Sequence, residues 1–372
     1  MSSTISPLAL RRHEAISPTE ELIAEAQAGR MFILVDDEDR ENEGDLIIPA
    51  QFATPQALAF MMREARGLIC LAMTSTQIDR LELPMMAVAN QQRHQTAFTV
   101  SIDARQGVTT GVSARDRAHT IALAINPETD PADLVTPGHV FPLAARPGGA
   151  LVRAGHTEAA VDLCKLAGLP QVAVICELAN DDGTVMVGPE IVTFCDKHKL
   201  KRISVADLIA YRQSREKLVE RVATFPVKTS IGELTGHAFR TRFDPVLHFA
   251  FVHGSIGDGR AVPARLHRAD IIDDIFGGGL IDRVLKGFKE DGKGVLVYLR
   301  DGSAGVPANL SGAESLNADA ARASQWREVG LGAQILRDLG VTSIRLRTNA
   351  PRKYVGLAGF GVEIAAIESI EG

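Results

Sequence analysis

Cysteine is scarce in this sequence, with four residues among 372, and none follows Cys195. The four do not form a C-x-x-C pair or another spacing typical of metal ligands, so we expect neither a disulfide framework nor a structural zinc site. Each cysteine has apolar neighbours in the sequence, which is typical of a small buried hydrophobic side chain. The cysteine pattern therefore indicates a protein of a reducing compartment.

Long apolar runs and a surplus of positive charge are missing as well. Residues 1–17 lack the apolar core of a signal peptide, and no apolar stretch approaches the length of a transmembrane helix. The formal net charge is −6 at pH 7 and no basic face dominates, which argues against a nucleic-acid-binding protein. We expect a cytoplasmic protein that binds neither nucleic acid nor a membrane.

The spacing of apolar residues predicts helices that alternate with strands, and hence a mixed α/β (α+β) fold. Ser17 and Glu20 form a predicted capping box for the first helix, with Pro18 at its first position. Thr157 is the predicted N-cap of a later helix, which Gly168 closes. The predicted helices cover residues 17–29, 115–125 and 158–167, and a long one runs from 204 into the charged stretch 212–221. The predicted strands of this half cover residues 31–35, 98–102 and 172–176.

The character of the chain changes after about residue 223. Glycine clusters appear at 254–259 and 277–279, and strands are predicted over residues 246–252, 294–299 and 343–346. At 45% hydrophobic residues, the chain is long enough for two ordinary domains. We therefore predict an N-terminal domain over residues 1–220 and a smaller α/β domain over residues 221–372.

Residues 36–45 hold the densest charge of the chain, with seven acids and one arginine between two apolar segments. Carboxylates this close repel one another and resist burial. A divalent cation with oxygen ligands would offset the charge, and Arg40 would suit a phosphorylated ligand beside it. The alternative is a charged turn between two strands, and the run alone does not decide between them.

Residues 153–158 form a second candidate site. Arg153 carries a planar charged group suited to phosphate, and Gly155 lets the backbone approach a ligand closely. His156 precedes the predicted helix, whose first amides form an anion site. Simple helix capping is the alternative.

Two single residues complete the inventory. His139 lies in a predicted loop over residues 137–143 that two prolines stiffen, although a structural role is the alternative. Glu177 ends an apolar strand, where a carboxylate facing a cleft is a candidate acid or base and otherwise a surface residue. Together, these residue types suit metal-assisted proton abstraction next to the carbonyl of a sugar phosphate.

Five segments of the first half, in this order, resemble 3,4-dihydroxy-2-butanone 4-phosphate synthase, an enzyme family of riboflavin biosynthesis. They are DDEDRENEGDLI, GVTTGVSARDR, PGHVFPL, RAGHTEAAVDL and CELANDDGT. The resemblance extends over residues 17–215 and shows no departure at a family active-site position. It implies a three-layer domain around a mixed sheet, and a homodimer with active sites near the subunit interface.

That family converts D-ribulose 5-phosphate to L-3,4-dihydroxy-2-butanone 4-phosphate and formate with two magnesium ions. The resemblance implies that Glu41 contacts both ions, that His156 binds one, and that His139 and Glu177 are essential for catalysis. Manganese is an alternative metal, because a histidine ligand suits it as well. The acidic run and the region of Cys70 are expected to form covering loops that exclude water. The implied substrate contacts are Arg40, Glu41, Asp45, Arg153, Ala154, Gly155, His156, Thr157 and Glu177.

The second half resembles GTP cyclohydrolase II, but with losses. Residues 264–267 (ARLH) resemble the segment that leads into that family's zinc site, and residues 345–353 resemble its nucleotide-binding segment. The family then requires three cysteines, C-x10-C-x-C, where this chain has Asp270 and no cysteine. Residues 298–305 also lack the glutamate and second arginine of the family's YxRQEGRGxG. We therefore expect a catalytically inactive half without zinc.

Other interpretations of the second half remain open. It would serve as a regulatory or nucleotide-binding module through Thr348 and Lys353, or as a docking module for a pathway enzyme. A bifunctional chain would require GTP hydrolysis without cysteine. A metal site rebuilt from His267, Asp270 and Asp273 would use acids that are usually solvated.

Overall fold

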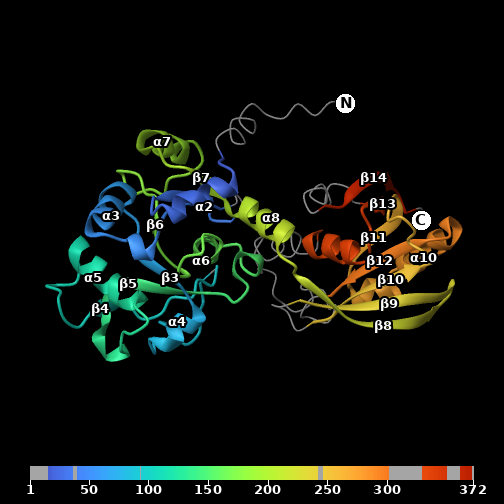
Figure 1. Ribbon diagram of the computed structural model, residues 1–372, viewed down its shortest axis with the longest axis horizontal. Coiled ribbons are helices and arrows are strands. Elements are labelled where there is room, and N and C mark those ends of the chain that lie inside the picture. Colours follow the sequence, from blue (N-terminus) through green and yellow to red (C-terminus); the bar gives the residue numbers. More distant parts are fainter. Residues whose placement is uncertain are drawn as a thin grey trace. The chain divides into compact units, whose positions relative to one another are not determined.

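The computed structural model describes residues 16–36, 40–92, 94–241, 246–300, 329–349 and 361–370. The chain divides into two compact units, Met1–Ile209 and Ala210–Gly372, and each contains one seven-stranded mixed sheet (Figure 1). The predicted mixed α/β class is therefore confirmed. None of the helices in these ranges has the length and apolar character that crossing a membrane requires.

The sheet of the first unit combines parallel and antiparallel pairs. Strands β1 and β2 form a hairpin, β2 and β3 both run antiparallel to β6, and β5 runs parallel to β3. In spatial order the strands are β4 (Ile102–Ala104), β5 (Leu134–Ala145), β3 (Cys70–Thr74), β6 (Val172–Glu177), β2 (Gly44–Pro49), β1 (Phe32–Val35) and β7 (Arg202–Ser204).

Helices cover both faces of this sheet, which gives the predicted three layers. Helices α2 (Thr19–Gln27) and α6 (His156–Leu166) contact each other and the strands on one face. Side chains on the other face, such as Leu46 and Val174, form a buried core with helix residues including Ile121. The helical segments of that core are α3 (Pro55–Phe60), η2 (Met61–Ala65), α4 (Ser75–Arg80), α5 (Ala114–Ile125) and α7 (Pro189–His198). Short 3-10 turns cover η1 (Ala50–Phe52), η3 (Pro131–Asp133) and η4 (Gly149–Leu151).

Helix α8 (Val205–Arg215) runs into the second unit, whose sheet has two parts. Strands β8, β9, β10 and β12 pair antiparallel, whereas β12, β11, β13 and β14 pair parallel. Helix α10 packs Phe288 and Leu285 against Leu296 of β12. The strands are β8 (Val219–Thr229), β9 (Gly232–Thr241), β10 (His248–His253), β11 (Val262–Arg268), β12 (Gly294–Leu299), β13 (Ser343–Arg347) and β14 (Glu363–Glu368). The helices are α9 (Ile271–Phe276), α10 (Leu280–Asp291) and residues 329–338.

Two predicted helix caps are wrong, although the helices are present. Pro18 is the N-cap of α2 and makes no side-chain hydrogen bond to it, so Ser17 and Glu20 form no capping box. Helix α6 begins at His156 after an extended Gly155, so Thr157 is its second residue rather than its cap. Gly168 has a φ of +71° and follows the helix end as predicted.

Three further expectations also fail. Residues 137–143 lie in strand β5 rather than in a loop, and strand β4 begins only at Ile102 rather than at residue 98. By contrast, the long helix α8 ends at Arg215, inside the charged stretch as predicted. Cys70 begins the central strand β3 and is 2% exposed, so it lies in the core rather than in a covering loop. All four cysteines are buried and free, as predicted.

Candidate metal and substrate site

The acidic run is a turn of the β1–β2 hairpin that folds around one buried carboxylate. Asp36 accepts the backbone N–H of Glu41 at 3.1 Å and that of Glu43 at 2.9 Å. Arg40 donates to Asp36 at 2.8 Å and to Glu41 Oε2 at 2.5 Å, with both the Arg40 and Asp36 side chains buried. The run is therefore a charged turn with an internal arginine. Residues 37–39 lie outside the described residues.

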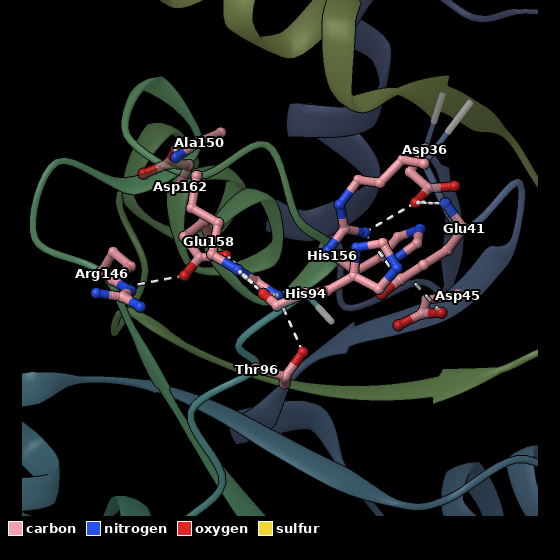
Figure 2. A network of polar contacts seen from close by, with 12 residues as sticks. Asp36, Glu41, Asp45, His94, Thr96, Arg146, Ala150, His156, Glu158 and Asp162 are labelled. Carbon is pink, nitrogen blue, oxygen red and sulfur yellow. Dashed lines mark hydrogen bonds and ion pairs between the residues drawn. The ribbon is translucent and has the colours of Figure 1, made fainter. Parts of the chain in front are cut away.

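Carboxylates of this turn meet the imidazole at the start of α6. His156 Nδ1 lies 3.8 Å from Glu41 Oε2 and 3.8 Å from Asp45 Oδ1 of strand β2 (Figure 2). Asp36, Glu41 and His156 offer ligand atoms that all lie within 4.8 Å of one another, and no other such group occurs in the described ranges. Glu41 and His156 were predicted as metal ligands, whereas Asp36 had no predicted individual role.

The atoms of this cluster fit a divalent cation. Asp45 Oδ1 and His156 Nε2 are buried and have no hydrogen-bond partner among the described residues. A buried polar atom without a partner costs about 1–3 kcal/mol, which a bound cation or an ordered water would recover. Burial, reinforced by the charge of Glu177, raises the pKa of Asp45 well above its usual range. Burial lowers the pKa of His156 and so favours the neutral imidazole, which is the form that binds metal.

Glu177 lies next to this cluster at the same edge of the sheet. It is the last residue of β6 and pairs with Asp45 of β2 in the strand register. Its carboxylate accepts the backbone N–H of Leu68 at 2.8 Å. A Cβ on Gly67 would lie 2.4 Å from the Glu177 carbonyl oxygen, so only glycine leaves room for this approach. The structure thus anchors the predicted acid or base beside the candidate metal ligands.

His139 occupies a bulge two strands away from Glu177. Ile102 of β4 pairs with Val140 and Asp103 pairs with Val135, so residues 136–139 of β5 bulge between these pairs. In the sheet, β3 lies between β5 and β6, so His139 and Glu177 come from strands that are not neighbours. Asp103 Oδ2 lies 2.7 Å from His139 Nδ1, and Asp103 was not among the predicted site residues.

Arg153 has protein partners rather than an open guanidinium. It donates to Glu158 at 2.6 Å, to the backbone carbonyl of His94 at 3.1 and 3.2 Å, and to Thr96 at 2.9 Å. These hydrogen bonds hold His94 near the carboxylates of the acidic turn. His94 Nε2 lies 3.9 Å from Glu41 Oε1. His94 was not predicted. Of the neighbouring predicted contacts, Ala154 is half-buried, while Gly155 and Thr157 are buried at the helix start.

This geometry agrees with a family match. Residues 20–211 match the family described as 3,4-dihydroxy-2-butanone 4-phosphate synthase. The chain belongs to this synthase family. The predicted enzyme class and its place in riboflavin biosynthesis are thereby confirmed. Residues 220–369 match the family described as GTP cyclohydrolase II, so the predicted order of the two families is confirmed as well.

The names of individual relatives differ in whether they say monofunctional or bifunctional. The Arabidopsis thaliana protein named monofunctional riboflavin biosynthesis protein RIBA 2, chloroplastic, is 45% identical, over 95% of this synthase-family chain and 77% of its own. The bifunctional riboflavin biosynthesis protein RIBA 1, chloroplastic, of the same organism is 44% identical, over 94% of this chain and 68% of its own. The names of such close relatives therefore do not decide whether this chain is bifunctional.

Two solved structures of synthases are also similar. RibBX, a two-domain 3,4-dihydroxy-2-butanone 4-phosphate synthase from A. baumannii, has a TM-score of 0.81 and 38% identity, covering 96% of this chain and all of its own. A 3,4-dihydroxy-2-butanone 4-phosphate synthase in complex with two magnesium ions has a TM-score of 0.53 and 39% identity. It covers 54% of this chain and 98% of its own.

We expect Glu43 of the acidic turn to make the stability of the metal-free synthase unit depend on pH. Burial and the charges of Glu41 and Asp36 raise the pKa of Glu43 to about 7. Between the unfolded pKa and about 7, the folded chain binds more protons than the unfolded chain, so its stability falls as the pH rises.

We expect the melting temperature in EDTA to fall from about pH 5.5 to about pH 7.5, and Glu43→Gln to reduce that slope. Magnesium should raise the melting temperature more at the higher pH, because metal binding releases protons. Thermal unfolding of both proteins at the two pH values measures this effect. An identical pH dependence in the two proteins would show that Glu43 does not cause it.

Proposed function

We propose that this chain converts D-ribulose 5-phosphate to L-3,4-dihydroxy-2-butanone 4-phosphate and formate, with magnesium held by Glu41 and His156. The observation that carries the proposal is that Glu41 and Asp45 of the acidic run meet His156 of α6, and that Asp45 Oδ1 and His156 Nε2 are buried without a hydrogen-bond partner among the described residues. Two ions and the alternative of manganese follow from the family resemblance and stay predictions. When bound, the metal would stabilise negative charge on the substrate oxygens.

The residues of the chain have separable tasks in this proposal. Glu177 is fixed at the strand end beside Asp45 and is suited to move one proton of the sugar. His139 lies on β5, with β3 between it and β6, and is suited to move a second proton. Arg40, Asp45 and the segment from Arg153 to Thr157 would bind the substrate. In that segment the first amides of α6, rather than the engaged guanidinium of Arg153, are suited to the phosphate.

We also propose that the second unit does not hydrolyse GTP. Asp270, which stands near the first zinc-cysteine position of the cyclohydrolase family, caps α9 by accepting the N–H groups of Ile272 and Asp273. His267 Nε2 lies 2.6 Å from Asp274 Oδ1, and Tyr298 donates to the same carboxylate. Asp270, His267 and Tyr298 therefore have hydrogen-bond partners within the protein. This argues against a metal site rebuilt from His267, Asp270 and Asp273.

The segment that resembles the nucleotide-binding segment of the cyclohydrolase family has its arginines engaged within the protein. Arg345 and Arg347 both form ion pairs with Asp291 and Glu368. Residues 350–353 of this segment, and residues 301–305 of the other altered motif, lie outside the described residues. A regulatory, nucleotide-binding or docking role stays a prediction, as do the homodimer, the domain boundary near residue 220 and the cytoplasmic location.

The full-length chain is expected to release formate from D-ribulose 5-phosphate in the presence of magnesium. Chelation with EDTA should abolish the release, and added magnesium should restore it, because in this proposal the metal stabilises the negative charge on the substrate oxygens. The measurement is formate production with each substrate supplied separately. Formate from GTP would contradict an inactive second unit, and EDTA-resistant release from the sugar phosphate would contradict the metal site.

A further inference from the structure

The His139 side chain is held by both oxygens of one carboxylate. Asp103 Oδ1 accepts the backbone N–H of His139 at 3.0 Å, and Asp103 Oδ2 lies 2.7 Å from its ring Nδ1. The Asp103 side chain is 11% exposed, whereas the His139 side chain is 43% exposed. The carboxylate is therefore enclosed, and the imidazole projects from it toward the outside.

This contact decides where the neutral imidazole carries its proton. An ionised carboxylate accepts hydrogen bonds and donates none, so Nδ1 must be the protonated nitrogen. Nε2 then carries the lone pair, and no group among the described residues bonds to it. A carboxylate that fixes one ring nitrogen in this way sets the tautomer and orientation of the other.

A glycine-rich loop encloses the pair from a third segment. A Cβ on Gly111 would lie 2.1 Å from Asp103 Oδ2 and 2.7 Å from His139 Nδ1, so the backbone of this loop lies against the hydrogen bond itself. Asp116 fixes the loop by accepting from the Thr109 hydroxyl at 2.7 Å and from the Gly111 N–H at 3.2 Å. The loop thus shields the carboxylate side of the pair and leaves the Nε2 side open.

We propose that Asp103 is the positioning residue that keeps His139 in the Nδ1–H tautomer, with Nε2 presented to the substrate. The inference rests on the proposed function, in which His139 moves a proton. In this arrangement Asp103 acts only through His139, to which both of its oxygens are hydrogen-bonded. This role accounts for the enclosed carboxylate of Asp103 and for the bulge of β5 that places His139 beside it.

The test compares Asp103→Asn, Asp103→Glu, His139→Ala and the double variant Asp103→Asn/His139→Ala, with Asp79→Asn as the control. Asp79 is an exposed acid on α4, so its variant should match the wild type. Asp103→Asn should lower kcat for formate release about 10²- to 10³-fold, because the amide allows the wrong tautomer. The KM for D-ribulose 5-phosphate and the magnesium affinity should change by less than about 2-fold, and Asp103→Glu should recover part of kcat.

The double variant separates positioning from a merely structural role. If Asp103 acts through His139, adding Asp103→Asn to His139→Ala causes no further loss of kcat. An additional loss of similar size in that background overturns the proposal, as does an unchanged kcat in Asp103→Asn alone. A wild-type chain that releases no formate from the sugar phosphate overturns the proposed function instead, which keeps the two failures distinct.

A spectroscopic measurement decides the proposal even where a variant does not fold. The ¹⁵N resonances of the His139 ring in the wild-type chain, assigned by their loss in His139→Ala, should show a protonated Nδ1 and an unprotonated Nε2. In Asp103→Asn the same resonances should shift toward a mixture of the two tautomers. A wild-type ring protonated on Nε2 alone overturns the proposal.

Discussion

Replacing Glu41 by alanine is expected to lower kcat/KM for formate release from D-ribulose 5-phosphate by more than about 10²-fold. Loss of a group that only supports a metal ligand already costs about 10- to 100-fold, and Glu41 is the ligand itself in our proposal. Its Oε2 lies 3.8 Å from His156 Nδ1, so its removal leaves Asp45 and an Asp36 that is already engaged by Arg40. Magnesium binding measured by calorimetry should weaken in parallel with the rate.

Two further variants make the Glu41 result specific. Glu41→Gln keeps the size of the side chain but removes its charge, and is expected to lose most of the activity as well. Glu128→Gln removes one negative charge at an exposed position after α5 and should retain the wild-type rate. His156→Ala should reproduce the loss seen with Glu41→Ala. Full activity in either alanine variant would refute the metal site.

Much of the secondary structure was predictable because its signals are local. The strand predicted over residues 294–299 is β12 as the structure has it, and the predicted helix over residues 115–125 differs from α5 by one residue. Both carry the apolar spacing of their element in a single window of sequence. Helix starts were less predictable, because Gly155 rather than Thr157 precedes α6 and its backbone conformation depends on neighbouring segments.

The bulge that carries His139 had no local signal of this kind. Two prolines in seven residues favoured a loop, but pairing with β4, more than thirty residues earlier in the chain, draws the segment into β5. Such a pairing is a tertiary contact that overrides local propensity. The sequence therefore indicated the residue correctly as a candidate and its local structure wrongly.

Some residues of the site also had a signal in the sequence, whereas others had none. Glu41, His156 and Glu177 stood in segments dense with charge or glycine, and the family resemblance linked segments more than a hundred residues apart. Asp103 directly follows the strand predicted over residues 98–102, at a polar position of the alternation, and only the structure shows that it is buried. His94 lies in a polar stretch without any pattern, and only the contact of Arg153 with its carbonyl reveals its proximity to Glu41.

Replacing Gly138 by alanine is expected to damage folding and catalysis together. A Cβ at this position would lie 2.0 Å from the carbonyl carbon of Ile102 and 2.3 Å from the backbone nitrogen of Asp103. These are backbone atoms of β4, so the clash is relieved only by moving the strand that carries Asp103. Overpacking of this kind costs about 1–3 kcal/mol or more of unfolding free energy.

Displacement of β4 by even 1 Å should also separate Asp103 from His139, and such misplacement can cost about 10²-fold in rate. Magnesium affinity should persist, because Glu41 and His156 belong to the β1–β2 turn and to α6 rather than to β4 or β5. Thermal unfolding, formate release and magnesium calorimetry on Gly138→Ala measure the three effects. Gly168→Asn is the control, because a Cβ there meets nothing within 4 Å and asparagine tolerates its φ of +71°. A Gly138→Ala chain with wild-type stability and rate would mean that the bulge does not hold His139 in place.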